Sequence, residues 1–223
     1  GGASAKPFVT HHNAYDASLY LRVSPELYLK RLVVGGFADA VFELGRLFRN
    51  EGVSTRHNPE FTAIEGYHAY KDYHDIMELV ENLVSTLVKD IHGSTKIQFG
   101  EHELDFTAPW KRRSMIDLIK DETGIDFLGF DDVDSAKKAA RDLKVDVKDC
   151  RNWGQVVAAV FEDKVEHKLI QPTHVTDLPL DISPLAKVHR NNPRLVERFE
   201  TFVNTWEIAN AFSELNDPAI QRE

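Results

Sequence analysis

Apolar and polar residues follow two different periods along the chain, which predicts both helices and strands. Between residues 73 and 91 apolar side chains recur every three or four positions, the spacing of one helix face. A helix is also predicted over residues 25–34, with Ser24 as its N-cap and Gly35 and Gly36 after its end. From residue 110 to residue 169 the pattern is helical and charged, most clearly over residues 134–143 and 154–167.

Other segments have the alternation of strands. Residues 40–48 and 60–70 are predicted as two strands joined by a polar loop, and the loop is too long for a tight hairpin. Further strand segments are residues 95–106, as a hairpin, 169–176, and 198–215, as one long strand or two strands with an irregularity. We therefore expect an α/β fold of the α+β kind, with a mostly antiparallel sheet flanked by helices.

The loop between the first two strands has the most informative composition. Arg49 and Glu51 lie two residues apart at a strand end and are expected to face one way. The returning strand places Phe61, Ala63, Glu65 and Tyr67 on one face. Burying such charges fully would be very costly, so the patch is expected to be an open site for a charged ligand. The alternative is a solvated hairpin with surface ion pairs.

Composition narrows the class of protein. The 223 residues are 42% hydrophobic and can bury one large core, or a core and an inserted subdomain. No apolar run has the length of a membrane span and no signal peptide opens the chain, so no membrane association is expected. Cys150 is the single cysteine, which excludes an internal disulfide and a zinc cluster and fits the cytoplasm. The net charge of -9 argues against a broad nucleic-acid surface.

Several blocks of the sequence resemble one enzyme family. Residues 48–62 resemble motif 2 of the class II aminoacyl-tRNA synthetases. Residues 1–8, 11–14 and 19–30 are similar to the pattern between motifs 1 and 2 of lysyl-tRNA synthetases, and residues 207–218 to the strand that closes the amino-acid pocket. The resemblance covers residues 1–223. It implies a partial class II synthetase-like catalytic domain, within which residues 110–169 form an inserted helical unit.

This resemblance implies ATP-dependent activation of an amino acid, with Mg²⁺ as the metal cofactor. Arg49 matches the arginine that bridges the α-phosphate and the substrate carboxylate, and a guanidinium fork suits that task. Phe61 matches the ring on which adenine stacks. The other nucleotide-binding positions are Glu51, His57, Asn58 and Glu207. Glu200 and Glu207 match the magnesium carboxylates, and oxygen ligands are what that ion needs.

The amino acid implied is lysine. Glu65, Tyr67 and Glu214 match the site of the side-chain ammonium, and Phe212 the wall against the stem. Gly2 and Glu26 match contacts to the α-ammonium, and Asn210 a contact to the carboxylate. The spacing of Asn210, Phe212 and Glu214 independently places them on one strand face. A pocket for aspartate or asparagine would need basic or amide groups instead of two carboxylates.

Some of these positions have other interpretations. Phe61 and Phe212, taken singly, are typical of a core, and Glu200 and Glu207 of a strand surface. Glu207 differs in parity from both Glu200 and Asn210, so an ideal strand cannot aim all three one way. A β-bulge near residues 204–206 would correct this. The adjacent His11 and His12 would point in opposite directions in a strand, so we do not expect a metal pair there.

The sequence also departs from the family pattern. Motif 1 with its dimer interface, motif 3 and the anticodon-binding domain fall outside residues 1–223, so the isolated segment is expected to be inactive or very weak. Residues 204–206 and 38–40 differ locally from the family. The leading hypothesis is a piece of a lysine–tRNA ligase whose full-length form is a cytoplasmic homodimer that acts on lysine and tRNA(Lys). The alternatives are a non-catalytic lysine-binding module and a paralogous ligase that transfers lysine to a protein.

Overall fold

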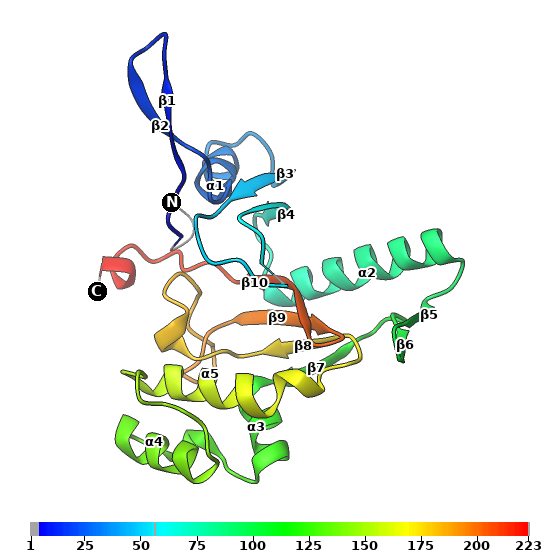
Figure 1. The fold of residues 1–223 in the computed structure, drawn as a ribbon, viewed down its shortest axis with the longest axis vertical. Helices are drawn as coiled ribbons and strands as arrows, with labels where there is room; N and C mark the ends of the chain where they lie inside the picture. The colour runs from blue at the N-terminus through cyan, green and yellow to red at the C-terminus, as the bar shows by residue number, and fades with distance from the viewer. Residues whose placement is uncertain (1–4, 56, 223) are drawn as a thin grey trace. The chain divides into compact units, whose positions relative to one another are not determined.

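The computed structural model describes residues 5–55 and 57–222, which form an α/β structure with mostly antiparallel strands. They divide into two compact units, residues 1–70 and 71–223 (Figure 1). The predicted fold class is confirmed. Gly2 lies outside the described residues. No described helix is both long and apolar enough to cross a membrane.

The first unit is built around one long antiparallel strand pair. The hairpin β1 (Val9–His12) and β2 (Ala17–Tyr20) precedes the helix α1 (Glu26–Val34). β3 (Ala40–Phe48) then pairs with β4 (Glu60–His68) over its whole length, from Ala40 opposite His68 to Phe48 opposite Glu60. The predicted pairing of these two segments is confirmed, although the second strand ends at His68. α1 contacts both β3 and β4.

One end of α1 differs from the prediction. The helix begins at Glu26 after Pro25, and Pro25 caps it without any side-chain hydrogen bond. Ser24 is therefore not the N-cap. Its hydroxyl instead accepts a hydrogen bond from the backbone N–H of Glu26 at 3.1 Å and also binds a carboxylate on β4.

The second unit contains a four-stranded sheet in the order β10-β9-β8-β7. Its strands are β7 (Lys111–Ser114), β8 (Thr173–Thr176), β9 (Arg198–Val203) and β10 (Trp206–Phe212). β7 and β8 are parallel and the other pairs antiparallel. β7 was not predicted, because it lies within residues 110–169, whose pattern is helical. Its four residues, three of them basic, show no alternation of apolar and polar side chains. A small hairpin, β5 (Lys96–Phe99) and β6 (His102–Asp105), confirms the predicted one.

Helices cover both faces of this sheet (Figure 1). α2 (Tyr73–His92) lies on one face, where Phe199 packs with Tyr73 and Met77. α3 (Met115–Thr123), α4 (Val133–Asp142) and α5 (Trp153–Lys164) belong to the main core on the other face, where the rings of Phe161 and Phe202 are 5.8 Å apart. Short 3-10 turns complete the unit at Phe127–Gly129, Glu166–Lys168, Leu180–Ile182 and Ile220–Arg222.

Residues 198–215 form two strands, one of the two predicted possibilities. Asn204 and Thr205, both with positive φ, make the tight turn between β9 and β10. The irregularity lies between Glu207 and Ala209, not at residues 204–206 as predicted. The positions 204 and 205 are occupied by the turn itself, so the extra residue is accommodated in the following strand.

Candidate functional site

The end of β3 holds the predicted catalytic arginine against an aromatic ring. The backbone N–H of Arg49 donates to the carbonyl of Pro59 at 2.8 Å, which closes the base of the loop. Its side-chain Nε is 3.5 Å from the carbonyl of Val23, and its guanidinium carbon lies 5.2 Å from the centroid of the Phe61 ring. Arg49 and Phe61 are thus brought together as predicted, in an arrangement where a cation faces a π system.

The loop after Arg49 carries the other predicted nucleotide-binding residues. Glu51, His57 and Asn58 are all exposed. His57 Nδ1 and Ser54 Oγ are 3.0 Å apart, and Asn58 Nδ2 donates to the carbonyl of Glu60 at 2.6 Å. These residues are accessible on the loop itself, as the binding of a large polar ligand requires.

The inner face of β4 carries a carboxylate held by two hydroxyl groups. Tyr67 donates to Glu65 Oε1 at 2.8 Å, and Ser24 lies 3.1 Å and 3.3 Å from the two carboxylate oxygens. Glu65 and Tyr67 are half-buried while their neighbours Ile64, Gly66 and His68 are exposed. The predicted shared strand face is therefore present, and it presents a fixed anion.

A second carboxylate lies at the start of α1. Glu26 is 6% exposed and its Oε1 is 2.6 Å from Nζ of Lys30, one helical turn later. The same Nζ lies 5.4 Å from the centroid of the Tyr67 ring. Sequence reasoning missed both Ser24 and Lys30. The spacing of Glu26 and Lys30 is the ordinary signal for an ion pair on a helix, and Ser24 before a helix is the ordinary signal for a cap.

β9 and β10 of the second unit carry the remaining predicted residues. The register sets Asn210 opposite Glu200, Phe212 opposite Arg198, and Glu207 opposite Phe202. The bulge between Glu207 and Ala209 places Glu207 and Asn210 on the same sheet face, the alignment that an ideal strand could not give.

Polar contacts tie this face together. Arg198 donates from Nη2 to Glu200 Oε1 at 2.7 Å and from Nε to Asn210 Oδ1 at 3.1 Å. Phe212 is half-buried against the main core, which is the core role considered for it. Glu214 is half-buried beyond the end of β10, in an isolated bridge with Ala186.

The carboxyl group of Glu200 has a raised pKa. Burial of its carboxyl group, which is 16% exposed, together with the negative charge of Glu207, raises its pKa to about 7 even though Arg198 opposes the shift. Weaker repulsion comes from Glu166 and Glu162. A carboxylate held near a second carboxylate is stabilised by a cation, and oxygen donors of this kind suit Mg²⁺. Glu200 and Glu207 fit that ion as two ligands of a site that substrate oxygens or water would complete. Within residues 5–55 and 57–222, no group of three or more His, Cys, Asp or Glu residues is placed to hold a metal.

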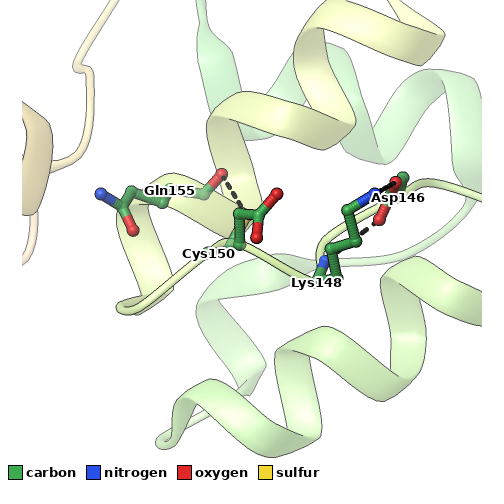
Figure 2. A pocket seen from close by; sticks show the side chains of 5 residues that line it. Asp146, Lys148, Cys150 and Gln155 are labelled. Carbon is green, nitrogen blue, oxygen red and sulfur yellow. Dashed lines mark hydrogen bonds and ion pairs between the residues drawn. The ribbon is translucent and has the colours of Figure 1, made fainter.

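The second unit also contains a pocket. A hollow of about 360 Å³ beside α5 is lined by Asp146, Lys148, Asp149, Cys150 and Gln155, whose side chains are drawn in Figure 2. Lys148 pairs with Asp146 at 3.2 Å, and the Cys150 thiol lies 3.5 Å from the carbonyl of Gln155. Burial raises the pKa of Cys150, which disfavours the reactive thiolate. This hollow shares no residue with the predicted site, and two of its charged residues, Lys148 and Asp146, are paired with each other.

Comparison with known proteins identifies the family. The family model of the class II tRNA synthetases (D, K and N) matches residues 1–223. A lysine–tRNA ligase of Sinorhizobium medicae is 57% identical over 222 residues, and one of Oceanobacillus iheyensis is 55% identical, each aligned with 100% of this chain and 45% of the relative. A lysine–tRNA ligase of Nostoc sp. is 54% identical over 224 residues and 40% of its length. The chain thus spans less than half of the curated relatives it matches.

The match to the family model extends over the whole chain, and the predicted pairing of the segments that flank the loop after Arg49 is present in β3 and β4. The identity to the ligases is spread over the same length. The chain belongs to the class II tRNA synthetases of the D, K and N family.

Proposed function

We propose that this chain is part of the catalytic domain of a lysine–tRNA ligase, which activates lysine with ATP and transfers it to tRNA. The observation that carries the proposal is the anionic cluster on the inner face of the first unit, in which Glu65 is fixed by Tyr67 and Ser24. A fixed carboxylate beside an aromatic ring suits an ammonium group, whereas an aspartate side chain would be repelled. The ligase names of the relatives at 55–57% identity support the same amino acid.

Substrate lysine is proposed to be bound by the residues that match the amino-acid site of the family. Glu65, Tyr67 and Glu214 take the side-chain ammonium, and Phe212 packs on the apolar stem. Asn210 takes the carboxylate, and Glu26 with Gly2 the α-ammonium. Of these, Glu65, Tyr67 and Glu26 already have a common arrangement in the first unit, because Ser24 contacts both Glu65 and the N–H of Glu26.

The reaction requires two anions to approach each other. The carboxylate of lysine attacks the α-phosphate of ATP, pyrophosphate leaves, and the adenylate forms. Arg49 is proposed to bind both groups with its planar fork, so that alignment and charge neutralisation come from one side chain. Phe61 provides the surface for adenine, and Glu51, His57 and Asn58 contact the nucleotide from the exposed loop.

Glu200 and Glu207 are the residues proposed to hold Mg²⁺. The ion supplies charge neutralisation for the phosphates when bound. Glu200 must be ionised to act as a ligand, and Arg198 beside it favours that form against the effect of burial. Asn210 is held by the same Arg198, so its position is coupled to that of Glu200.

The full-length protein is proposed to be a cytoplasmic homodimer that binds tRNA(Lys). Residues 110–169 are proposed as an insertion of the catalytic domain, since they follow the first strand pair and contain α3, α4 and α5. These proposals follow from the family and from relatives more than twice as long as this chain.

The test is lysine-dependent exchange of pyrophosphate into ATP by the full-length protein. Arg49→Ala should lower the exchange rate by about a hundredfold to a thousandfold, as for other removed catalytic charges. Arg46→Ala is the matched control, because Arg46 is on the outer face of β3 with its side chain 72% exposed. A normal exchange rate for Arg49→Ala would remove Arg49 from the mechanism. Lysine binding without exchange by the wild type would favour the binding module, and exchange without charging of tRNA the protein-modifying ligase.

A further inference from the structure

The ammonium group of Lys30 has the surroundings that the proposed function assigns to the ammonium groups of the substrate. Its Nζ is 2.6 Å from Oε1 of Glu26 and 5.4 Å from the centroid of the Tyr67 ring. Glu26 is the proposed partner of the α-ammonium of lysine, and Tyr67 of its side-chain ammonium. The side chain of Lys30 therefore lies beside both Glu26 and Tyr67, the proposed partners of the two ammonium groups of lysine.

This ion pair differs from an ordinary pair on a helix surface. Exposed pairs four residues apart contribute little to stability, because water solvates both charges well. Here the Glu26 side chain is 7% exposed and that of Lys30 is 27% exposed. A carboxylate so deeply buried is costly when it has no cation beside it. Lys30 meets that requirement.

We propose that Lys30 is an internal surrogate for the substrate, which occupies the ammonium position between Glu26 and Tyr67 and is displaced when lysine binds. The inference rests on the proposed function and adds a conformational step to it. Two ammonium groups would repel each other if both contacted Glu26, so the substrate can take this contact fully only after Lys30 has moved.

Displacement has a definite thermodynamic signature. An internal occupant stabilises the free protein and lowers the apparent affinity for the ligand by the fraction of molecules in which the position is open. Removing the occupant should therefore have opposite effects on the two quantities: the free protein becomes less stable, and lysine binds more tightly. If Lys30 had a purely structural role, its removal would lower both the stability of the free protein and the affinity for lysine. If Lys30 contacted bound lysine, its removal would weaken lysine binding.

The experiment compares wild type, Lys30→Met and Lys30→Gln in the full-length ligase. Met keeps an unbranched apolar stem of similar length and a similar helix propensity, while Gln keeps a polar end without charge. Calorimetric titration with L-lysine should show a Kd lower by about three- to tenfold in both variants. The KM for lysine in pyrophosphate exchange should fall with it while kcat is unchanged, and the melting temperature without ligand should fall. Lys71→Met is the control, because Lys71 forms a comparable pair with Asp75 at 2.8 Å in the second unit.

A second measurement uses only the wild-type protein, so its result does not depend on whether a variant folds. Reductive methylation of Lys30, followed by mass spectrometry, should become faster when lysine is added, because displacement moves the amine toward solvent. Glycine at the same concentration controls for the added amine. Slower methylation, or variants that bind lysine no more tightly than wild type, would overturn the surrogate role alone. A wild-type ligase that binds no lysine would instead overturn the proposed function, and the inference with it.

Discussion

At the scale of single residues, the first unit holds a carboxylate in a fixed position. Glu65 accepts hydrogen bonds from Tyr67 and Ser24, so its carboxylate has little freedom of rotation. Such fixed groups lower the entropy lost when a ligand binds. The strand alternation predicted that Glu65, Tyr67 and Phe61 share a face, because parity is a local property of the backbone. The contacts of Ser24 with Glu65 and of Lys30 with Tyr67 could not be predicted, because they depend on how α1 packs on β4. The ion pair of Glu26 and Lys30 lies within α1, and its spacing in the sequence was the one available signal.

The hydroxyl of Tyr67 is predicted to contribute to lysine binding by holding Glu65. Tyr67→Phe keeps the ring but removes the donor that lies 2.8 Å from Glu65 Oε1. Calorimetry should show lysine binding weakened by about fivefold to tenfold, which corresponds to about 1 kcal/mol for one hydrogen bond. Tyr70→Phe, at a side chain that is 96% exposed, is the control. Equal affinities for wild type and Tyr67→Phe would show that the hydroxyl has no role in the site.

The raised pKa of Glu200 predicts a pH-dependent effect on stability. Because its pKa rises from 4.5 to about 7 on folding, the folded chain binds more protons than the unfolded chain in this window. The stability that this group contributes is present below pH 4.5 and is lost as the pH rises through 7. Glu200→Gln removes that loss, so the variant should gain stability relative to wild type as the pH rises from 5 to 8.

The gain is on the order of 3 kcal/mol at its maximum, and urea unfolding at the two pH values measures it. Glu101→Gln, at the exposed end of the small hairpin, is the control. The same variant should weaken Mg²⁺-dependent nucleotide binding, since a ligand is lost. A stability difference between Glu200→Gln and wild type that is constant from pH 5 to pH 8 would refute the assigned cause.

At the scale of elements, the sheet of the second unit is joined to α2 by a buried polar network. His174 on β8 is fully buried and lies 3.1 Å from Glu81 on α2 and 2.8 Å from Thr201 on β9. Arg112 on β7 donates to the same Glu81 oxygen at 3.0 Å. The helical period of α2 could be predicted, but the polar Glu81 in its buried stripe had no local explanation. The other members of the network come from three separate strands, and only the folded sheet brings them together.

His174 predicts sensitivity to acid. Burial lowers its pKa to about 4, although the carboxylate of Glu81 opposes the shift. The folded chain then binds fewer protons than the unfolded chain, so stability is lost as the pH falls from about 6.5 to 4. His174→Gln should be less stable than wild type at pH 7 by about 1–3 kcal/mol, because Glu81 and Thr201 lose a well-placed partner. The difference should shrink toward pH 4, as urea unfolding can measure, and a difference that widens in acid would contradict this account.

Close packing at the start of α5 predicts a strong effect of one methyl group. A Cβ at Gly154 would lie 2.8 Å from Cβ of Asp181 and 2.9 Å from Cβ of Pro179. Gly154→Ala should therefore destabilise the chain by about 1–3 kcal/mol, despite the better helix propensity of alanine. Gly129→Ala is the control, because a Cβ there would meet no atom within 4 Å. Thermal unfolding compares the two, and equal melting temperatures would show that α5 can shift freely.

The bulge in β10 shows where local reasoning ends. The different parity of Glu207 and Asn210 required an irregularity in the strand, and one is present between Glu207 and Ala209. Its predicted place was three residues too early, because the two residues with positive φ at 204 and 205 form the turn instead. The need for a bulge follows from the side chains that must share a face, whereas its position depends on the pairing with β9.

At the scale of the whole molecule, each unit contributes a distinct part of the proposed chemistry. The first unit carries Arg49, Phe61 and the anionic cluster around Glu65. The second unit carries Glu200, Glu207 and Asn210. The family is shown by matches over the entire chain, but its description includes enzymes for three amino acids. The choice of lysine therefore depends on the charge of the pocket residues, and this choice is the central claim about function.

That claim is tested most directly by calorimetric titration of the full-length protein with L-lysine, L-aspartate and L-asparagine. We expect L-lysine to bind, and Glu65→Gln and Glu214→Gln each to weaken its binding by on the order of 1.5–3 kcal/mol, the usual contribution of a charge-assisted hydrogen bond. Neither L-aspartate nor L-asparagine should bind at the same concentrations. Binding of L-aspartate as tightly as L-lysine, or lysine binding unchanged in both variants, would contradict the assignment of an acidic lysine pocket.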